Sequence, residues 1–281
     1  MPDRTLLSAR TESQARAYDD LYKNFDSPLM RRLRQEAYGK DQDIGQHSWV
    51  TAAELEHDLP RLALSRASRF LDLGCGPCGP LGFLTSQAGC HGTGMDLSGE
   101  ALAAGRKRLA SLGLDRLTTL HQTDLNDPIP FASGSFDAVV SLDVILHLRD
   151  RLRVFREVAR VLLSRGRFLF TDAGVITSPV SDEEIQLRSV YGYTQFVPPG
   201  FNERTLESAG FRLTERHDRT ASLLKNASGR LAARLAHQAE LEPIEGSACF
   251  VRHQRYLETV IALSQRGAVS RMMYLAESPA L

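Results

Sequence analysis

The sequence has few cysteines, no excess of charge of either sign and no long apolar run. Four cysteines in 281 residues are too few for a disulfide framework and fit a reducing cytoplasm. A formal net charge of zero gives no basic field to attract nucleic acid or an anionic membrane. No run approaches the length of a membrane span, and the first ten residues lack the apolar core of a signal peptide. We therefore expect a cytoplasmic protein that binds neither nucleic acid nor membranes.

From Arg69 onwards, short apolar runs alternate with amphipathic segments. This pattern is typical of βαβ units and a parallel sheet. Ser98 is placed to cap a helix that ends at Gly113, and a later helix, closed by Gly166, contains Leu152, Phe155, Val158 and Leu162. Five strands are expected in this region, at 69–73, 90–97, 117–125, 135–143 and 166–173.

The remaining segments predict helical cover around this α/β core. Residues 1–60 are expected to form a helical lid, and residues 61–281 the main domain. The alternation breaks in two insertions, at 174–200 and 220–265. The second of these should hold two long helices separated by a loop, "LEPIEGS". Strands are also expected within 202–218 and at the C-terminal end.

The stretch "DLGCGPCGP", residues 72–80, allows three interpretations: a dithiol redox centre, a dinucleotide-binding loop or a loop that binds S-adenosylmethionine (SAM). A redox cysteine needs an exposed thiolate at a helix N-terminus, whereas Cys75 lies in a glycine turn near the carboxylate of Asp72, which raises the thiol pKa. Zinc is disfavoured because neither Cys90 nor Cys249 belongs to a second ligand pair. No metal site is predicted.

The charge of Asp72 separates the other two interpretations. Asp96 follows Gly76 by 20 residues, as a ribose-binding acid would in a dinucleotide fold. A carboxylate at the end of the first strand, however, would repel a pyrophosphate. SAM carries an ammonium group and a sulfonium, both cationic, and Gly74, Gly76 and Gly79 would let the backbone approach its methionine moiety. The loop therefore favours SAM.

Further acids stand at the ends of the next two strands. Asp96, followed by Leu97, can accept both ribose hydroxyls, and Asp124 can accept the adenine amino group with Leu125 against the ring. Ligands of open α/β sheets bind at the carboxyl ends of the strands, so these acids surround one crevice.

In order along the chain, "FLDLGCGPCGP", "GTGMDLS", "TDL", "FDAVVSLDVILHL" and "RGRFLFTDA" resemble the motifs of class I SAM-dependent methyltransferases. The resemblance covers residues 68–173 and continues at 202–218. It implies a Rossmann-like, seven-stranded sheet ending in an antiparallel hairpin, with SAM as cofactor. The preceding stretch, "YGKDQDIGQHSWVTAAEL", resembles the lid of small-molecule methyltransferases. By that resemblance, Gln46 and Ser48 contact the methionine carboxylate and Trp49 packs over the site, although Trp49 could equally be a core aromatic.

Asp143 and His147 stand four residues apart just after the fourth strand, so one helical turn would turn both towards the same cleft. The segment resembles one in phosphoethanolamine N-methyltransferases, where the histidine acts in base chemistry and the acid holds the substrate. A neutral imidazole could remove the proton of an amine or hydroxyl, and Asp143 could fix its tautomer. The alternative is a structural histidine at the sheet edge. That family also uses a tyrosine upstream of the lid; here Tyr18 and Tyr22 are shifted from its position, which argues against phosphoethanolamine as substrate.

Tyr191 and Tyr193 are expected to form a substrate wall, or else to anchor the first insertion. The leading functional hypothesis is methyl transfer from SAM to a nitrogen or oxygen of a small molecule, in specialised metabolism. Methylation of RNA or protein, and a non-catalytic SAM-binding module, remain as alternatives. The apolar stripes of the late helices suit core packing or a homodimer.

Overall fold

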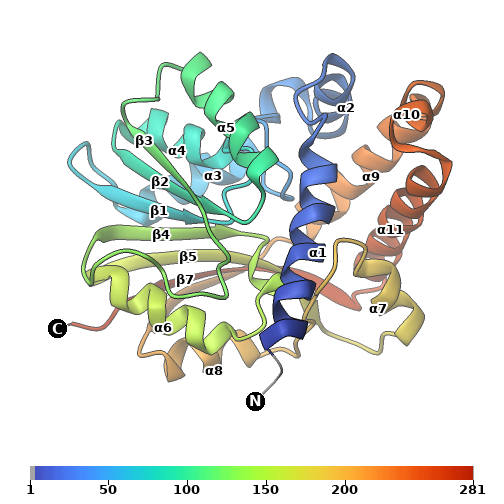
Figure 1. Ribbon diagram of the computed structural model, residues 1–281. Helices are drawn as coiled ribbons and strands as arrows, with labels where there is room; N and C mark the ends of the chain where they lie inside the picture. Colours follow the sequence, from blue (N-terminus) through green and yellow to red (C-terminus); the bar gives the residue numbers. More distant parts are fainter. Residues whose placement is uncertain (1–3, 281) are drawn as a thin grey trace.

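The computed structural model describes residues 4–280 and contains a seven-stranded sheet with strand order β3-β2-β1-β4-β5-β7-β6 (Figure 1). Neighbouring strands from β3 to β5 are parallel, and β7 runs antiparallel to both β5 and β6. The α/β sheet predicted from the sequence is confirmed. The strands are β1 (Arg69–Leu73), β2 (His91–Asp96), β3 (Thr118–Gln122), β4 (Phe136–Leu142), β5 (Leu162–Ile176), β6 (Arg212–Asp218) and β7 (Val269–Glu277).

Helices cover both faces of the sheet (Figure 1). One face carries α3 (Ala52–Asp58), α4 (Gly79–Ala88) and α5 (Gly99–Ser111), and the other carries α6 (Arg151–Val161) and α8 (Phe201–Ser208). Because the central strands are buried on both faces, they read as continuous apolar runs. Ser98 caps α5 by accepting a hydrogen bond from the Ala101 amide, as the sequence predicts.

A helical cap stands beside the carboxyl ends of the strands. It is built from α1 (Arg4–Tyr22), α2 (Pro28–Tyr38), α7 (Asp182–Arg188), α9 (Thr220–Ala236), α10 (Gln238–Glu245) and α11 (Ser247–Gln265). Helix α2 packs on α9, and α11 packs on both α9 and α7, while α1 lies between the sheet and α11 in Figure 1. The N-terminal lid and the two late insertions, far apart in the sequence, thus form one structure. Within residues 4–280, no helix combines the length and the apolar character needed to cross a membrane.

Two boundaries differ from the sequence predictions. Leu162 belongs to β5 rather than to the preceding helix, because it pairs with Phe136 of β4. The predicted loop "LEPIEGS" instead contains the end of α10, even though Pro243 lies inside that helix. Leu241 of α10 is buried with Phe250 in the cap core, so burial of an apolar side chain outweighs the poor helix propensity of proline.

Candidate active site

A cavity of about 160 Å³ lies at the carboxyl ends of β1, β2 and β4, under the cap. We call it the strand-end cavity. This is where ligands of open α/β sheets bind. Most of the predicted site residues line it: Ser48, Trp49, Asp72, Gly74, Gly76, Asp96, Leu97, Asp124, Leu125, Asp143, His147 and Tyr191. Gln46, Gly79 and Tyr193 are not among the residues that line it.

The glycine loop turns sharply between β1 and α4. Gly74 has φ +79°, and a Cβ there would approach the Val144 side chain to 2.4 Å. Gly79 serves a different contact from the predicted one, since a Cβ there would lie 2.6 Å from the carbonyl oxygen of Gly45 in the lid. Gly74 therefore shapes the cavity, whereas Gly79 lets the lid approach helix α4.

Asp72, the fourth residue of β1, is 1% exposed and lines the strand-end cavity. Its Oδ2 atom is buried with no hydrogen-bond partner among the described residues. Burial, and then the charge of Asp96, raise the pKa of Asp72 to about 8. A buried carboxyl group without a partner is costly, and a cationic ligand in the cavity would remove that cost. The Oγ atom of Ser48, from the lid, is also buried without a partner.

The acids at the ends of β2 and β3 are held in fixed orientations. Asp96 accepts a hydrogen bond from the Gly76 amide at 2.8 Å and from the Ser98 amide at 2.9 Å. Asp124 accepts from the backbone and side-chain nitrogens of Asn126, both at 2.8 Å. Carboxylate oxygens keep further lone pairs in these bonds, so both groups can also accept from hydroxyl or amino donors of a ligand.

The surroundings of Cys75 in the loop oppose ionisation of its thiol. The Sγ atoms of Cys75 and Cys78 are 3.9 Å apart, and both residues are buried. The hydrogen bond with Cys78 and burial raise the pKa of Cys75 well above its ordinary value, with smaller contributions from Asp96 and Asp72. A dithiol redox centre requires the reverse.

Asp143 does not pair with His147, contrary to the sequence prediction. Its Oδ1 accepts from Arg271 Nε and from the Thr171 hydroxyl, both at 2.8 Å, and its Oδ2 accepts from the Trp49 amide at 2.8 Å. Asp143 has φ +61°, and the short 3₁₀ helix that follows spans only Ile145–His147. The four-residue spacing therefore does not correspond to a helical turn, and the carboxylate turns towards β5 and β7.

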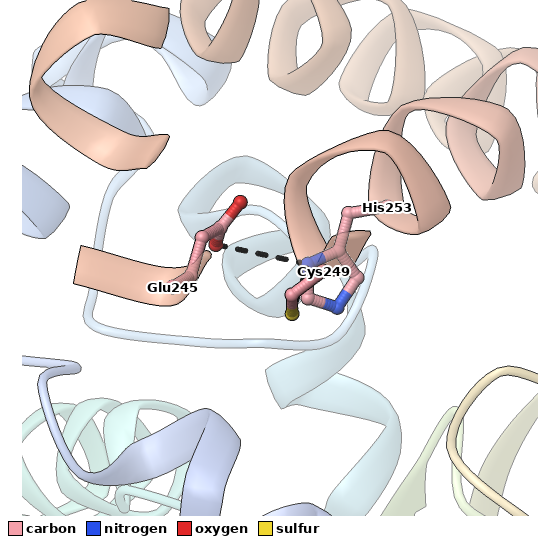
Figure 2. A group of neighbouring side chains, drawn as sticks. All are labelled: Glu245, Cys249 and His253. Atoms are coloured by element: carbon pink, nitrogen blue, oxygen red, sulfur yellow. Dashed lines mark hydrogen bonds and ion pairs between the residues drawn. The ribbon is translucent and has the colours of Figure 1, made fainter. Parts of the chain in front are cut away.

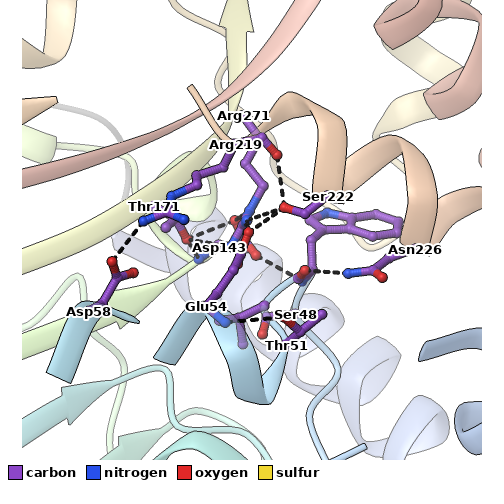
Figure 3. A network of polar contacts seen from close by, with 12 residues as sticks. Ser48, Thr51, Glu54, Asp58, Asp143, Thr171, Arg219, Ser222, Asn226 and Arg271 are labelled. Carbon is purple, nitrogen blue, oxygen red and sulfur yellow. Dashed lines mark hydrogen bonds and ion pairs between the residues drawn. The ribbon is translucent and has the colours of Figure 1, made fainter. Parts of the chain in front are cut away.

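Asp143 is part of a buried polar network that fastens the lid to the sheet (Figure 3). The Arg271 side chain is fully buried and bridges Asp143 and Glu54 of α3, with a distance of 2.9 Å to Glu54 Oε2. Ser222 of α9 makes a close hydrogen bond to Glu54, and Asn226 donates to the Trp49 carbonyl at 2.6 Å. Bonds of Trp49 with Asp143 and with Asn226 thereby join three segments that line the site: the lid, the turn after β4 and α9.

His147 is held by a backbone carbonyl. Its Nδ1 atom lies 2.9 Å from the carbonyl oxygen of Tyr193. Because a carbonyl only accepts, Nδ1 carries the proton and Nε2 keeps its lone pair. Burial lowers the pKa of His147, and the Tyr18 ring meets its imidazole edge-on at 6.0 Å. Tyr193 thus contributes its carbonyl, while the residue as a whole is exposed and does not line the cavity.

The other two lid predictions have different outcomes. Trp49 lines the cavity, and its ring stacks on the Tyr256 ring with a centroid distance of 6.4 Å. The Arg230 guanidinium lies over the Trp49 ring, 4.3 Å from its centroid. The Gln46 side chain bonds to the backbone of Ile44, Gln42 and Val50. Gln46 therefore stabilises the fold of the lid, and its placement gives no support to a contact with cofactor.

Several residues line the cavity that were not predicted as site residues, and two of them, Tyr18 and Tyr22, were expected to be shifted away from it. Gln14, Tyr18 and Tyr22 enter from α1, and Arg188, Arg230 and Tyr256 from the late insertions. Arg188 is 5% exposed and donates to the Tyr256 hydroxyl and the Ala173 carbonyl, with no carboxylate partner among the described residues. Nothing in the sequence around Arg188 distinguishes it from a surface arginine of a short helix.

The chain is similar to known methyltransferases in sequence and in fold. Residues 71–170 match the methyltransferase domain family. The glycine/sarcosine/dimethylglycine N-methyltransferase of Actinopolyspora halophila is 31% identical over 187 residues, covering 64% of this chain and 33% of that protein. The sarcosine/dimethylglycine N-methyltransferase of Halorhodospira halochloris is 34% identical over 164 residues, or 56% of each chain. The chain therefore aligns with between a third and about half of the length of these two relatives.

The fold has a counterpart among solved structures. Phosphoethanolamine N-methyltransferase 2 of Haemonchus contortus, in complex with phosphomonomethylethanolamine and S-adenosylhomocysteine, superposes with a TM-score of 0.76 at 19% identity, covering 94% of this chain and 60% of that one. Residues 71–170 therefore match a methyltransferase domain, and the fold is that of a solved methyltransferase, in agreement with the class I SAM-dependent methyltransferase motifs of the sequence.

Proposed function

We propose that the protein transfers the methyl group of SAM to a nitrogen or oxygen atom of a small molecule. The observation that carries this proposal is the buried, unpartnered carboxyl of Asp72 in the strand-end cavity, beside the fixed carboxylates of Asp96 and Asp124. SAM has one cationic group, its ammonium, and two sets of hydrogen-bond donors, its ribose hydroxyls and its adenine amino group, which match these three acids. A pyrophosphate would offer Asp72 no cationic partner and would oppose its ionisation.

The assignment of groups follows from this chemistry. Asp72 would pair with the methionine ammonium, Asp96 would accept the ribose hydroxyls, and Asp124 would accept the adenine amino group with Leu97 and Leu125 beside the ring. The unpartnered hydroxyl of Ser48 can donate to the methionine carboxylate. When bound, SAM supplies an electrophilic methyl carbon, and the protein aligns the acceptor with it and excludes water.

His147 is the proposed general base. Its lowered pKa keeps the imidazole neutral at physiological pH, and the Tyr193 carbonyl fixes the tautomer with a free Nε2. A protonated ammonium or a hydroxyl acceptor must lose its proton for a lone pair to attack the methyl carbon, and His147 lines the cavity in which this occurs.

Arg188 indicates the chemical class of the acceptor. A buried guanidinium without a carboxylate partner is costly, and an anionic group of the acceptor would compensate its charge. Trp49, Tyr191 and Tyr256 supply aromatic walls in the same cavity. The two relatives above are named for sarcosine and dimethylglycine, which are amines with a carboxylate. We propose an acceptor of this kind, with a carboxylate at Arg188 and the reacting atom near His147.

We also propose that the protein is cytoplasmic and acts on small metabolites. A cytoplasmic location is supported by its four cysteines, none of which forms a disulfide bond. Small metabolites are favoured over RNA or protein because α1 and the lid cover the cavity. A non-catalytic SAM-binding module would have no use for His147. A homodimer and a place in specialised metabolism rest on the sequence alone.

The test is a methyl-transfer assay with radiolabelled SAM and a panel of amino acids, amines and carboxylic acids. Each acid is paired with its methyl ester. Transfer to a carboxylate-bearing acceptor, with a weaker rate for its ester, supports the proposal. Transfer only to RNA or protein, or none to any acceptor while SAM still binds, contradicts it.

A further inference from the structure

A group of three metal-ligating side chains lies in the cap, outside the strand-end cavity (Figure 2). Cys249 and His253 are four residues apart on α11, so they share one face of that helix. Glu245 is the last residue of α10, and the turn at Gly246 brings it to the same place. One ligand atom from each residue lies within 4.8 Å of the other two.

The distances fit a tetrahedral ion. His253 Nδ1 is 3.7 Å from Cys249 Sγ and 3.8 Å from Glu245 Oε2. Zinc bonds of about 2.3 Å to sulfur and about 2.1 Å to nitrogen or oxygen, at tetrahedral angles, place neighbouring ligand atoms about 3.4–3.6 Å apart. The side chains would need to move by only a few tenths of an ångström at these two edges. Figure 2 shows the three side chains converging from two helices.

The same geometry disfavours a catalytic triad. In a thiol–imidazole–carboxylate relay, the two ring nitrogens face opposite partners. Here one nitrogen, His253 Nδ1, faces both the thiol and the carboxylate. Convergence of three ligand atoms on one point is the arrangement of a metal site.

Two arginines adjoin the group, and their contacts are compatible with an ion. Arg234 forms a close ion pair with Glu245 Oε1, while its nearest approach to Oε2 is 3.4 Å, so Oε2 keeps lone pairs for a metal. Arg252 donates towards Cys249 Sγ at 3.5 Å, a contact that a metal-bound thiolate can also accept. Groups of this kind, which bond to the ligands, orient them in metal sites.

The three residues also line a second cavity, of about 760 Å³, between α1, α2, α9 and α11. We call it the cap cavity. We propose that Glu245, Cys249 and His253 bind a divalent ion of the zinc class, with three protein ligands and a fourth position open to the cap cavity. The His253 and Tyr191 rings meet in a tilted arrangement with their centroids 5.8 Å apart, and Tyr191 lines both cavities. The ion would therefore hold the turn between α10 and α11 in place beside Tyr191, an aromatic wall of the proposed acceptor site. The ligands follow a Glu-x3-Cys-x3-His spacing, which differs from the paired cysteines on which the prediction of no metal site was based.

The test is titration of the metal-free, full-length protein with Co²⁺ alone, without SAM or acceptor. Near-ultraviolet absorption from thiolate-to-cobalt charge transfer reports a cysteine ligand, and competition with Zn²⁺ gives the affinity for zinc. We expect one equivalent of Co²⁺ to produce this band. Cys249→Ser should abolish it, and His253→Gln should lower the affinity at least about 100-fold, beyond the loss seen when an outer contact is removed.

Two matched variants control for other donors. Cys78→Ser removes one thiol of the Cys75–Cys78 pair in the glycine loop, and His237→Gln removes a histidine that contacts Glu36 and Glu240. Both should keep the band and its stoichiometry. Absence of the band in the wild type, its persistence in Cys249→Ser, or its loss in Cys78→Ser overturns the proposal. Circular dichroism of every variant confirms that it is folded. No result here depends on methyl transfer.

Discussion

The Nδ1 atom of His147 lies 2.9 Å from the carbonyl oxygen of Tyr193, so a loop of the first insertion determines which nitrogen of the proposed base is free. A carbonyl can hold only the neutral tautomer that is protonated at Nδ1 or the imidazolium. Burial lowers the pKa of His147, which makes the neutral form the resting one. Because a backbone atom of Tyr193 holds the base, replacing the Tyr193 side chain does not remove this contact.

Replacement of His147 by alanine should lower turnover about 10²–10⁴-fold and leave the affinity for S-adenosylhomocysteine nearly unchanged. His91→Ala, at the exposed opposite end of β2, is the matched control and should keep full activity. Steady-state kinetics and calorimetric binding measure the two quantities. A comparable loss of turnover and of cofactor affinity would reduce His147 to a structural role.

The pH profile of turnover should have an acidic limb below the ordinary imidazole pKa. The lowered pKa of His147 means that the base becomes protonated only at lower pH, so activity should persist through mildly acidic conditions. Rates measured across the acidic and neutral range, with saturating cofactor, test this. A limb above the ordinary value would contradict the assignment. The limb should vanish in His147→Ala.

Asp72→Asn should stabilise the cofactor-free protein at pH 8 by about 1–3 kcal/mol and abolish cofactor binding. The sign follows from the raised pKa of Asp72, about 8. Between the ordinary carboxyl pKa and 8, the native state holds a proton that the unfolded state releases. The contribution of protonated Asp72 to stability is therefore fully present below the ordinary carboxyl pKa, and it is lost as the pH rises from there through 8. Urea unfolding at several pH values measures this, and an equal pH dependence in wild type and variant would count against it.

Arg188→Met should raise the KM for a carboxylate acceptor at least about 30-fold. Methionine fills similar space and removes a buried charge that has no carboxylate partner among the described residues, so the folded state loses no ion pair. The methyl ester of the same acceptor serves as the control, since its KM should change little. Equal effects on acid and ester would mean that Arg188 does not bind the anion.

Asp143→Asn should destabilise the protein by about 3–5 kcal/mol, because it leaves the fully buried Arg271 with one carboxylate instead of two. Glu184→Gln, which breaks the exposed pair with Arg266, is the control and should cause a much smaller loss. Chemical unfolding compares the two. Unchanged stability in Asp143→Asn, with a loss of turnover alone, would instead restore Asp143 as a partner in catalysis.

The sequence was informative where local rules apply. Neighbouring residues in the sequence are enough to predict the glycine loop, the acids at successive strand ends and the Ser98 cap. Each of these features lies where it was expected. Asp143 shows the limit, because its left-handed backbone and its pairing with Arg271, 128 residues away, depend on tertiary structure. Arg188 was missed and Tyr18 was expected to be out of position for the same reason, since only the packing of the cap brings them to the cavity.

The most direct test of the central claim is a calorimetric titration of the wild type and Asp72→Asn with S-adenosylhomocysteine, beside NAD. We expect one equivalent of S-adenosylhomocysteine to bind the wild type, with proton release near pH 7 as Asp72 ionises against the ligand ammonium. Asp72→Asn should show no binding, and NAD should bind neither protein. Binding of NAD in place of S-adenosylhomocysteine, or unchanged affinity in Asp72→Asn, would contradict the account of this cavity.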